Sequence, residues 1–276
     1  MATRIELIRR MERAGATRIE TVSFASPKHV PQMAGAEEIC TALSQRSFGA
    51  IGLVLNERGL ERALSCDLDE INVVAYAADG YARKNTGAGA EERNAEAIAL
   101  VSRARHSGRR VSVTIAVAFG DPVDGRVPPE RVVALAAACA AAGAGEIALG
   151  DTIGVGNPVM VEHLVPAVAA AAPDAAVRCH FHNTRNAGYA NAVAAARAGA
   201  QTLDAAVGGF GGSPFSPGAG GNVATEDLTA LLHGMGLATG IDPVQAASTG
   251  AWLANQLGHD RPPAMLGRAT AFPGLV

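Results

Sequence analysis

Stretches typical of β-strands alternate with stretches typical of α-helices along most of the chain, and this alternation limits the possible folds more than any other feature. Seven short runs predict strands, and helical patterns separate them. Helices between successive strands favour a parallel sheet with right-handed crossovers. The predicted strands are Arg18–Ser23, Ala50–Leu55, Glu70–Ala75, Ser112–Ala118, Glu146–Gly150, Ala175–His182 and Thr202–Val207.

Local signals mark where some of the helices begin. The chain opens directly on a helix, for which Thr3 and Glu6 form a capping-box pattern. Asn157 followed by Pro158 is typical of an N-cap and the first helical residue. The polar stretch 76–89 carries no such pattern and is expected to be a loop.

Composition is that of a soluble protein with an aliphatic core. The chain has 276 residues, of which 49% are hydrophobic and only 4% aromatic, so Ala, Val, Leu and Ile must fill the interior. A net charge of −3 without a basic run argues against nucleic-acid binding. No apolar run reaches the roughly 20 residues that span a bilayer, and no secretory signal opens the chain. We therefore expect a cytoplasmic protein that does not bind membranes.

The four cysteines show no metal-binding or redox spacing. Cys40, Cys66, Cys139 and Cys179 lie far apart, each among apolar or helical residues. This pattern predicts buried free thiols in a reducing compartment.

Two features between residues 178 and 227 could carry chemistry. His180 and His182 stand two apart in a predicted strand, so both imidazoles would face one side, with Cα atoms roughly 6.5–7 Å apart. Such a pair can bind one metal ion, although a lone histidine near a strand end is more often structural. The glycine-rich segment Gly208–Asn222, which contains Ser213, is either a binding loop or a flexible linker.

Four separated segments resemble the 3-hydroxy-3-methylglutaryl-CoA (HMG-CoA) lyase family of metal-dependent TIM-barrel lyases. The resemblance is collinear over nearly the whole chain, and it implies a single (β/α)₈ TIM-barrel domain over residues 1–276. The segments are IETVSFASPKHVPQM at Ile19–Met33, EIALGDTIGVGNP at Glu146–Pro158, HFHNT at His180–Thr184 and GGFGGSPFSPGAGGNVATEDL at Gly208–Leu228.

The resemblance also predicts a gap in the barrel. A TIM barrel has eight strands, and the seven predicted here follow a helix where the family begins with a strand. In the family that first strand ends in an arginine that contacts substrate and an aspartate that completes the metal site. Neither has a counterpart here, so the first strand is expected to be missing, whether through a late start, a shortened chain or a degenerate relative.

Site residues follow from the resemblance position by position. His180, His182 and Asn222 match the family's metal ligands, and the expected ion is Mg²⁺ or Mn²⁺. Glu20 and Asp151 match positions that line the site, with a role in a polar network or in proton transfer. For Asp151, capping of a loop is an equally good interpretation.

Two positions depart from the family pattern. Ser213 stands where the family has a catalytic cysteine, and an unactivated hydroxyl cannot exchange a proton near neutral pH as a thiol can. Ser112 stands where the family tends to carry a basic residue. These departures leave open a different acyl group or an altered mechanism.

The implied reaction is a retro-aldol cleavage of a 3-hydroxyacyl-CoA, such as HMG-CoA, to a keto acid and acetyl-CoA, in the context of leucine catabolism and ketone-body formation. An acyl-CoA substrate and a homodimer are the expected partners. The alternatives are a related condensing synthase of the isopropylmalate or citramalate type, or an inactive truncated relative. Without the aspartate and the cysteine, we expect poor cleavage of HMG-CoA itself.

Overall fold

A single parallel sheet forms the centre of the molecule. The computed structural model describes residues 1–28, 30–212 and 221–268. Seven strands lie side by side in chain order, and each is hydrogen-bonded in parallel to the next, as the alternation predicted. The strands are β1 (Arg18–Ser23), β2 (Gly49–Val54), β3 (Glu70–Tyr76), β4 (Arg110–Ala116), β5 (Glu146–Asp151), β6 (Ala176–Phe181) and β7 (Thr202–Asp204).

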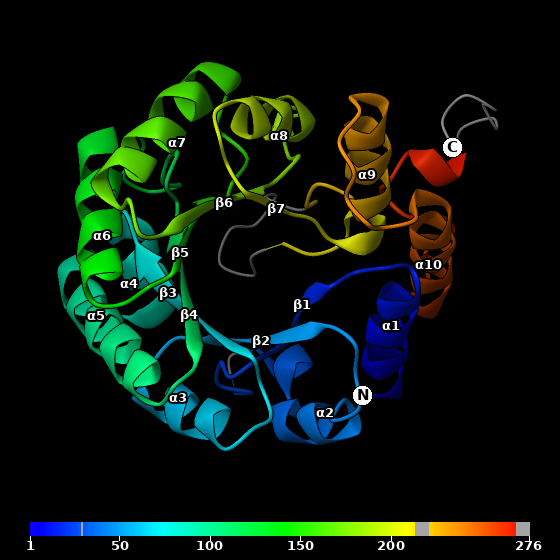
Figure 1. Ribbon diagram of the computed structural model, residues 1–276, viewed down its shortest axis with the longest axis horizontal. Helices are drawn as coiled ribbons and strands as arrows, with labels where there is room; N and C mark the ends of the chain where they lie inside the picture. The colour runs from blue at the N-terminus through cyan, green and yellow to red at the C-terminus, as the bar shows by residue number, and fades with distance from the viewer. Residues whose placement is uncertain (29, 213–220, 269–276) are drawn as a thin grey trace.

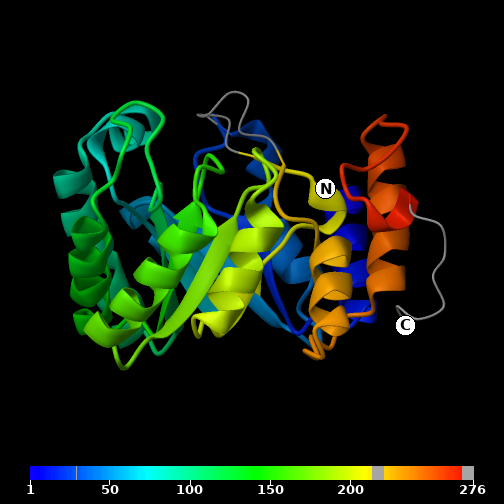
Figure 2. The ribbon, with the colours of Figure 1, turned by 90° about the horizontal axis from the view of Figure 1, so that it is seen from above.

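Helices surround the sheet on its convex side, and the sheet curls inside them (Figure 1). Figure 2 shows the helices standing upright around the strands. No helix in the described part of the chain is long and apolar enough to cross a membrane. The α-helices are α1 (Ala2–Arg13), α2 (Ala36–Ala42), α3 (Glu57–Leu64), α4 (Asp79–Thr86), α5 (Ala90–His106), α6 (Pro129–Ala141), α7 (Pro158–Ala171), α8 (Gly188–Arg197), α9 (Thr225–Gly234) and α10 (Pro243–Gln256). Short 3₁₀ turns are η1 (Pro31–Met33), η2 (Val207–Gly209) and η3 (Leu266–Arg268).

The sheet is a curled half-barrel with two ends, β1 and β7. Among the described residues no ladder joins these two strands, so the seven strands do not close on themselves. On this side α1 packs against α10, and a small apolar cluster that includes Met11, Val207 and Leu253 lies between them and η2. The expected seven-stranded, open form of the TIM barrel is confirmed.

One glycine makes the close packing of α1 possible. Gly15 follows the helix with a φ of +97°, and a Cβ built there would lie 2.1 Å from the carbonyl oxygen of Gly240. The next contact along the same seam is a hydrogen bond of 2.8 Å from the backbone N–H of Asp242 to the carbonyl of Ala14. Only glycine combines this φ with this approach, so α1 stays tied to the loop before α10.

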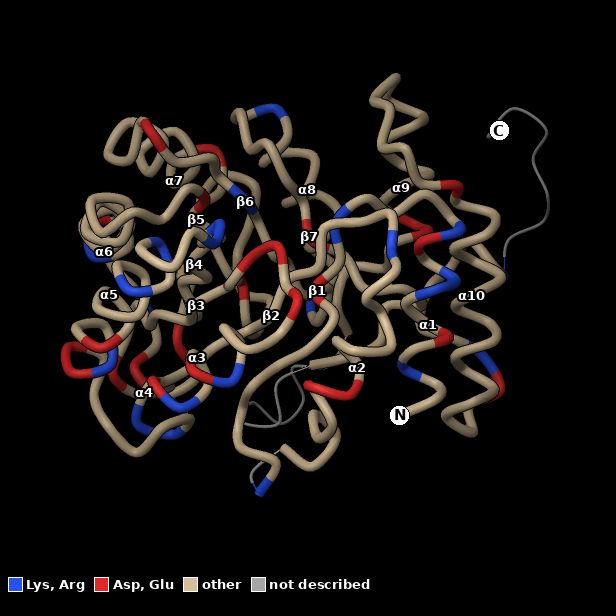
Figure 3. Tube along the Cα trace, turned by 60° about the horizontal axis from the view of Figure 1, so that its bottom comes forward, with Lys and Arg blue, Asp and Glu red and all other residues tan. Residues whose placement is uncertain are grey.

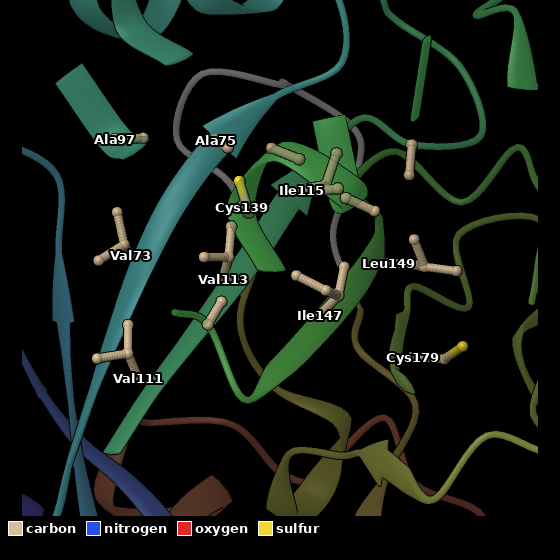
Figure 4. Close-up of a cluster of buried hydrophobic side chains, with 14 of the residues drawn as sticks. Val73, Ala75, Ala97, Val111, Val113, Ile115, Cys139, Ile147, Leu149 and Cys179 are labelled. Carbon is tan, nitrogen blue, oxygen red and sulfur yellow. The ribbon is translucent and has the colours of Figure 1, made fainter. Parts of the chain in front are cut away.

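The main core lies between the convex face of the sheet and the helices. Alternate residues of the central strands, such as Val73, Val113 and Ile147, point outward and are completely buried (Figure 4). Helical side chains such as Ala97 and Cys139 cover them. Aliphatic side chains thus build the core, as composition predicted. All four cysteines are buried and free, which confirms the predicted thiols.

Three local predictions were wrong. The helix α1 begins at Ala2 and has no side-chain cap, so Thr3 lies inside the first turn and the capping box does not form. The stretch 76–89 contains α4, whose first N–H groups at Gly80 and Tyr81 are bound by carboxylates from another loop. The last strand, β7, ends at Asp204, three residues earlier than predicted.

Candidate active site

Two histidines stand at the carboxyl end of β6, where active sites of parallel barrels lie. His180 lies on β6 and His182 follows the strand directly. Their rings are 5.2 Å apart between centroids and meet edge to face. His182 is buried, whereas the side chain of His180 is about one-third exposed at 32%. The strand therefore presents both imidazoles in one place, as its alternation predicted.

Asn222 lies against this pair. Its backbone forms an antiparallel bridge with His182, and the backbone N–H of Asn183 donates to the carbonyl of Gly221 at 2.8 Å. The side-chain Nδ2 donates to the carbonyl oxygen of Phe210 at 2.9 Å. Its Oδ1 is buried and has no hydrogen-bond partner among the described residues. A buried acceptor without a partner costs about 1–3 kcal/mol, so this oxygen is suited to meet a ligand.

Asp204 on β7 is the residue that sequence reasoning missed. It is paired directly with His180 in the β6–β7 ladder. Its Oδ2 lies 3.6 Å from Nδ1 of His180 and 3.5 Å from Nε of Arg178. Burial alone would raise the pKa of Asp204, but Arg178 and His180 outweigh it and hold the pKa below its usual value. Strand alternation, which puts Asp204 on the same face as Thr202, was the available signal.

Glu20 lies in the middle of β1 and not at its carboxyl end. Its Oε2 accepts a hydrogen bond of 2.8 Å from Nδ2 of Asn72, and the Oδ1 of Asn72 accepts one of 3.0 Å from Thr114. Nη2 of Arg178 contacts the Thr114 hydroxyl at 3.4 Å, so a polar chain crosses from β1 to β6. The side chain of Glu20 is exposed to solvent. Desolvation by the surrounding protein raises the pKa of its carboxyl group, against the opposing effects of Asn72 and Arg178.

Asp151, the last residue of β5, closes a loop. Its Oδ1 accepts from the backbone N–H of Val155 at 2.9 Å and its Oδ2 from that of Gly156 at 3.0 Å. Burial raises its pKa, and these two donors counteract the rise. Both oxygens thus have partners in the β5–α7 loop, which is the capping arrangement that the sequence left open for this residue.

A set of charged and hydroxyl side chains lies at the amino ends of the strands, and we call it the floor. Arg18 of β1 donates to Glu70 at 2.6 Å and to Glu146 at 2.5 Å. Ser112 donates to Glu70 at 2.5 Å, and Thr202 donates to Glu146 at 3.0 Å. Figure 3 shows acidic and basic positions along β1, β6 and β7, which lie within the ring of helices. Arg18 and Ser112 therefore bond the same carboxylate, so Arg18 supplies a basic group to the floor although the residue at position 112 is a serine.

The glycine-rich loop is anchored at both of its described ends. Both carboxylate oxygens of Glu226, at 2.9 and 3.1 Å, accept from the backbone N–H of Gly208. At the other end Gly221 donates to the carbonyl of Gly211 at 3.0 Å. Burial raises the pKa of Glu226 to about 7. Ser213, the predicted catalytic hydroxyl, lies outside the described residues.

Comparison with known proteins gives consistent matches. The model of the HMGL-like family matches residues 1–252. The (R)-citramalyl-CoA lyase of Chloroflexus aurantiacus is 43% identical over 287 aligned positions, covering 100% of this chain and 90% of that protein. The hydroxymethylglutaryl-CoA lyase of Pseudomonas mevalonii is 39% identical, covering 94% and 86%.

Solved structures agree with these matches. An HMG-CoA lyase from Acenitobacter baumannii, in complex with coenzyme A and 3-methylmalate, superposes with a TM-score of 0.90 at 33% identity, covering 98% of this chain and 90% of that one. The HMG-CoA lyase of Bacillus subtilis also gives a TM-score of 0.90, at 32% identity and with coverage of 97% and 91%.

Proposed function

The chain belongs to the HMGL-like family, and we propose that it cleaves a carbon–carbon bond of a short 3-hydroxyacyl-CoA by a metal-assisted retro-aldol reaction. Membership in this family makes it a lyase that acts on a CoA substrate. The proposed products are a keto acid and acetyl-CoA. The observation that carries the metal-assisted step is Oδ1 of Asn222, which is buried beside His182 and has no partner within residues 1–28, 30–212 and 221–268.

Three neutral donors would hold a divalent ion: the imidazoles of His180 and His182 and the amide oxygen of Asn222. The unpartnered oxygen and the adjacent rings fit this role, and amide oxygens suit Mg²⁺ or Mn²⁺. In the described part of the chain no three His, Cys, Asp or Glu side chains gather as a metal site, so we expect weak binding. When bound, the ion would withdraw electron density from substrate oxygens.

Proton transfer must accompany the bond cleavage. The substrate hydroxyl loses its proton as the bond between C2 and C3 breaks, and the enolate of acetyl-CoA takes up a proton at carbon. We assign Glu20 to the network that holds one of these protons, because hydrogen bonds through Asn72 and Thr114 join its carboxylate to Arg178. Asp151 would orient the β5–α7 loop, and Ser213 would hydrogen-bond the substrate.

One observation favours citramalyl-CoA as the substrate over HMG-CoA. Identity to the citramalyl-CoA lyase is 43% across the whole chain, against 39% to the hydroxymethylglutaryl-CoA lyase of Pseudomonas mevalonii. Both candidates are 3-hydroxyacyl-CoA thioesters and share the same bond cleavage. They differ in the keto acid released, which is pyruvate from citramalyl-CoA and acetoacetate from HMG-CoA.

The test is an assay of both thioesters with Mg²⁺ or Mn²⁺, in which acetyl-CoA and the two keto acids are measured separately. We expect acetyl-CoA release that a chelator stops and added ion restores. His182→Gln should abolish it, whereas His163→Gln, a change on the exposed face of α7, should not. Consumption of acetyl-CoA with a keto acid as co-substrate would instead identify a condensing synthase, and metal-independent cleavage would contradict the proposal.

A further inference from the structure

We propose that Asp204 is a positioning residue that holds His180 through its Nδ1 side, and that Arg178 in turn holds Asp204. The arrangement would direct the Nε2 atom of His180 towards the ion or substrate. This inference rests on the proposed function, because it assigns the support of one of the residues in that site. Asp204 and Arg178 have no assigned role in the reaction otherwise.

The backbone places the two side chains together. His180 and Asp204 are direct partners in the parallel β6–β7 ladder, so their side chains leave the sheet on the same face. Their closest atoms, Nδ1 and Oδ2, are 3.6 Å apart. This contact is longer than a hydrogen bond, and contacts of catalytic groups often shorten only when ligand is bound.

Arg178 supplies the second half of the support. Its Nε lies 3.5 Å from the same Oδ2 atom, and this buried Nε has no hydrogen-bond partner among the residues that the structure describes. Its Nη1 lies 3.5 Å from Glu146, and its side chain is only 3% exposed. The guanidinium therefore lies between Glu146 of the floor and Asp204, in ion-pair contact with both.

A carboxylate at Nδ1 determines which ring nitrogen carries the proton. A neutral imidazole then keeps its hydrogen on Nδ1 and leaves the lone pair of Nε2 available. Ligating histidines commonly donate their other N–H to a carboxylate in this way, and loss of that partner typically weakens metal binding or activity about 10–100-fold. The alternative is that Asp204 serves only as a counter-ion for Arg178.

A change at Glu146 distinguishes a partner of His180 from a mere counter-ion of Arg178. Glu146 also contacts Arg178, but it lies on β5 in the floor. The variants are Asp204→Asn, which keeps the size of the side chain, and Glu146→Gln. The readouts are the tautomer of His180 by ¹⁵N NMR at about pH 8, where histidine is ordinarily neutral, and the affinity for Mn²⁺. Asp174→Asn, on an exposed position after α7, is the surface control.

We expect Asp204→Asn to shift the His180 proton from Nδ1 towards Nε2 and to weaken Mn²⁺ binding about 10–100-fold. Glu146→Gln and Asp174→Asn should leave the tautomer unchanged. An unchanged tautomer in Asp204→Asn, or an equal shift in Glu146→Gln, would overturn the proposal. The tautomer is read without substrate, so absence of lyase activity would refute the proposed function and leave this result standing.

Discussion

The floor and the active-site end of the same strands contain similar polar groups, but these groups differ in how closely they are paired with other protein groups. In the floor Arg18 bonds two buried carboxylates at 2.5 and 2.6 Å, and hydroxyl groups supply further donors. At the other end Asp204 makes contacts of 3.5 and 3.6 Å, and Oδ1 of Asn222 has no hydrogen-bond partner in the part of the chain that the structure describes. The polar groups of the floor thus find close hydrogen-bond partners within the protein, whereas those named at the active-site end do not.

The difference indicates which end stabilises the fold and which end binds a ligand. Buried polar groups in folded proteins are nearly always hydrogen-bonded, and exceptions concentrate where function requires them. Removal of a floor residue should therefore lower stability, whereas removal of a residue at the active-site end should mainly lower ligand binding.

The largest effect should come from Arg18→Met in the floor. The change leaves Glu70 and Glu146 as buried carboxylates without Arg18, and loss of one partner of such a pair costs about 3–5 kcal/mol. The free energy of unfolding by urea measures it. Arg110→Met is the matched control, because Arg110 also approaches Glu70 but its side chain is 73% exposed at a distance of 3.9 Å. We expect less than about 1 kcal/mol there, and equal losses would contradict the comparison.

Asn222→Ala, in contrast to Arg18→Met, should weaken metal binding strongly and change stability little. We expect Mn²⁺ binding to fall by more than about 100-fold, because a ligand matters more than its supporting partners. Stability should change by less than about 1 kcal/mol, since one hydrogen bond to Phe210 is lost and one unpartnered oxygen is removed. Calorimetric titration and urea unfolding measure the two. Asn255→Ala, on the exposed side of α10, should change neither.

Two buried carboxyl groups should respond to pH in opposite directions. Arginines hold the pKa of Glu146 below its usual value despite burial, whereas burial raises the pKa of Glu226 from 4.5 to about 7. The folded state therefore binds the Glu226 proton more tightly than the unfolded state. That contribution favours folding at low pH and is lost as pH rises from about 4.5 to 7, by about 2–3 kcal/mol.

Glu226→Gln tests this dependence. We expect the variant to unfold with a free energy that no longer falls between these pH values, and to be the more stable protein at pH 8. Urea unfolding across the pH range measures it. Glu162→Gln on the exposed side of α7 is the control, and a slope that persists in Glu226→Gln would assign the dependence to another group.

The smallest effect should come from Asp151→Asn. The amide keeps one acceptor for the loop and loses the other, which costs about 1 kcal/mol. Turnover should change by less than about 10-fold if the residue only closes the loop. Asn157→Ala, which removes the N-cap of α7 next to this loop, should cost a similar amount. A loss of turnover of about 10²–10⁴ in Asp151→Asn alone would instead show proton transfer.

The strands were predictable because their signal is local. Short strand-like runs separated by helical patterns predicted all seven strands in their order, with ends shifted by a few residues. The helix α4 was missed because its support is not local. Carboxylates of Asp121 and Asp124, some forty residues away in sequence, accept from the N–H groups of its first turn.

The candidate site likewise contains residues that local sequence spacing indicated and one residue that only the sheet register brings in. The spacing of His180 and His182 indicated a shared face, and the fold brings Asn222 to them across the strand end. Asp204 carries no motif, since a single aspartate at the end of a short strand is unremarkable in sequence. Its register opposite His180 is a property of the sheet.

The sequence by itself determined the order of strands and helices and which residues face inward, because both follow from a period of two in strands and 3.6 in helices. Tertiary structure alone decided which inward groups meet. Arg18 reaches Glu146 across 128 positions of sequence, and Asp204 meets His180 only because β6 and β7 pair in this register. Such contacts depend on how strands from distant parts of the chain curl around a common interior, and no local pattern encodes that geometry.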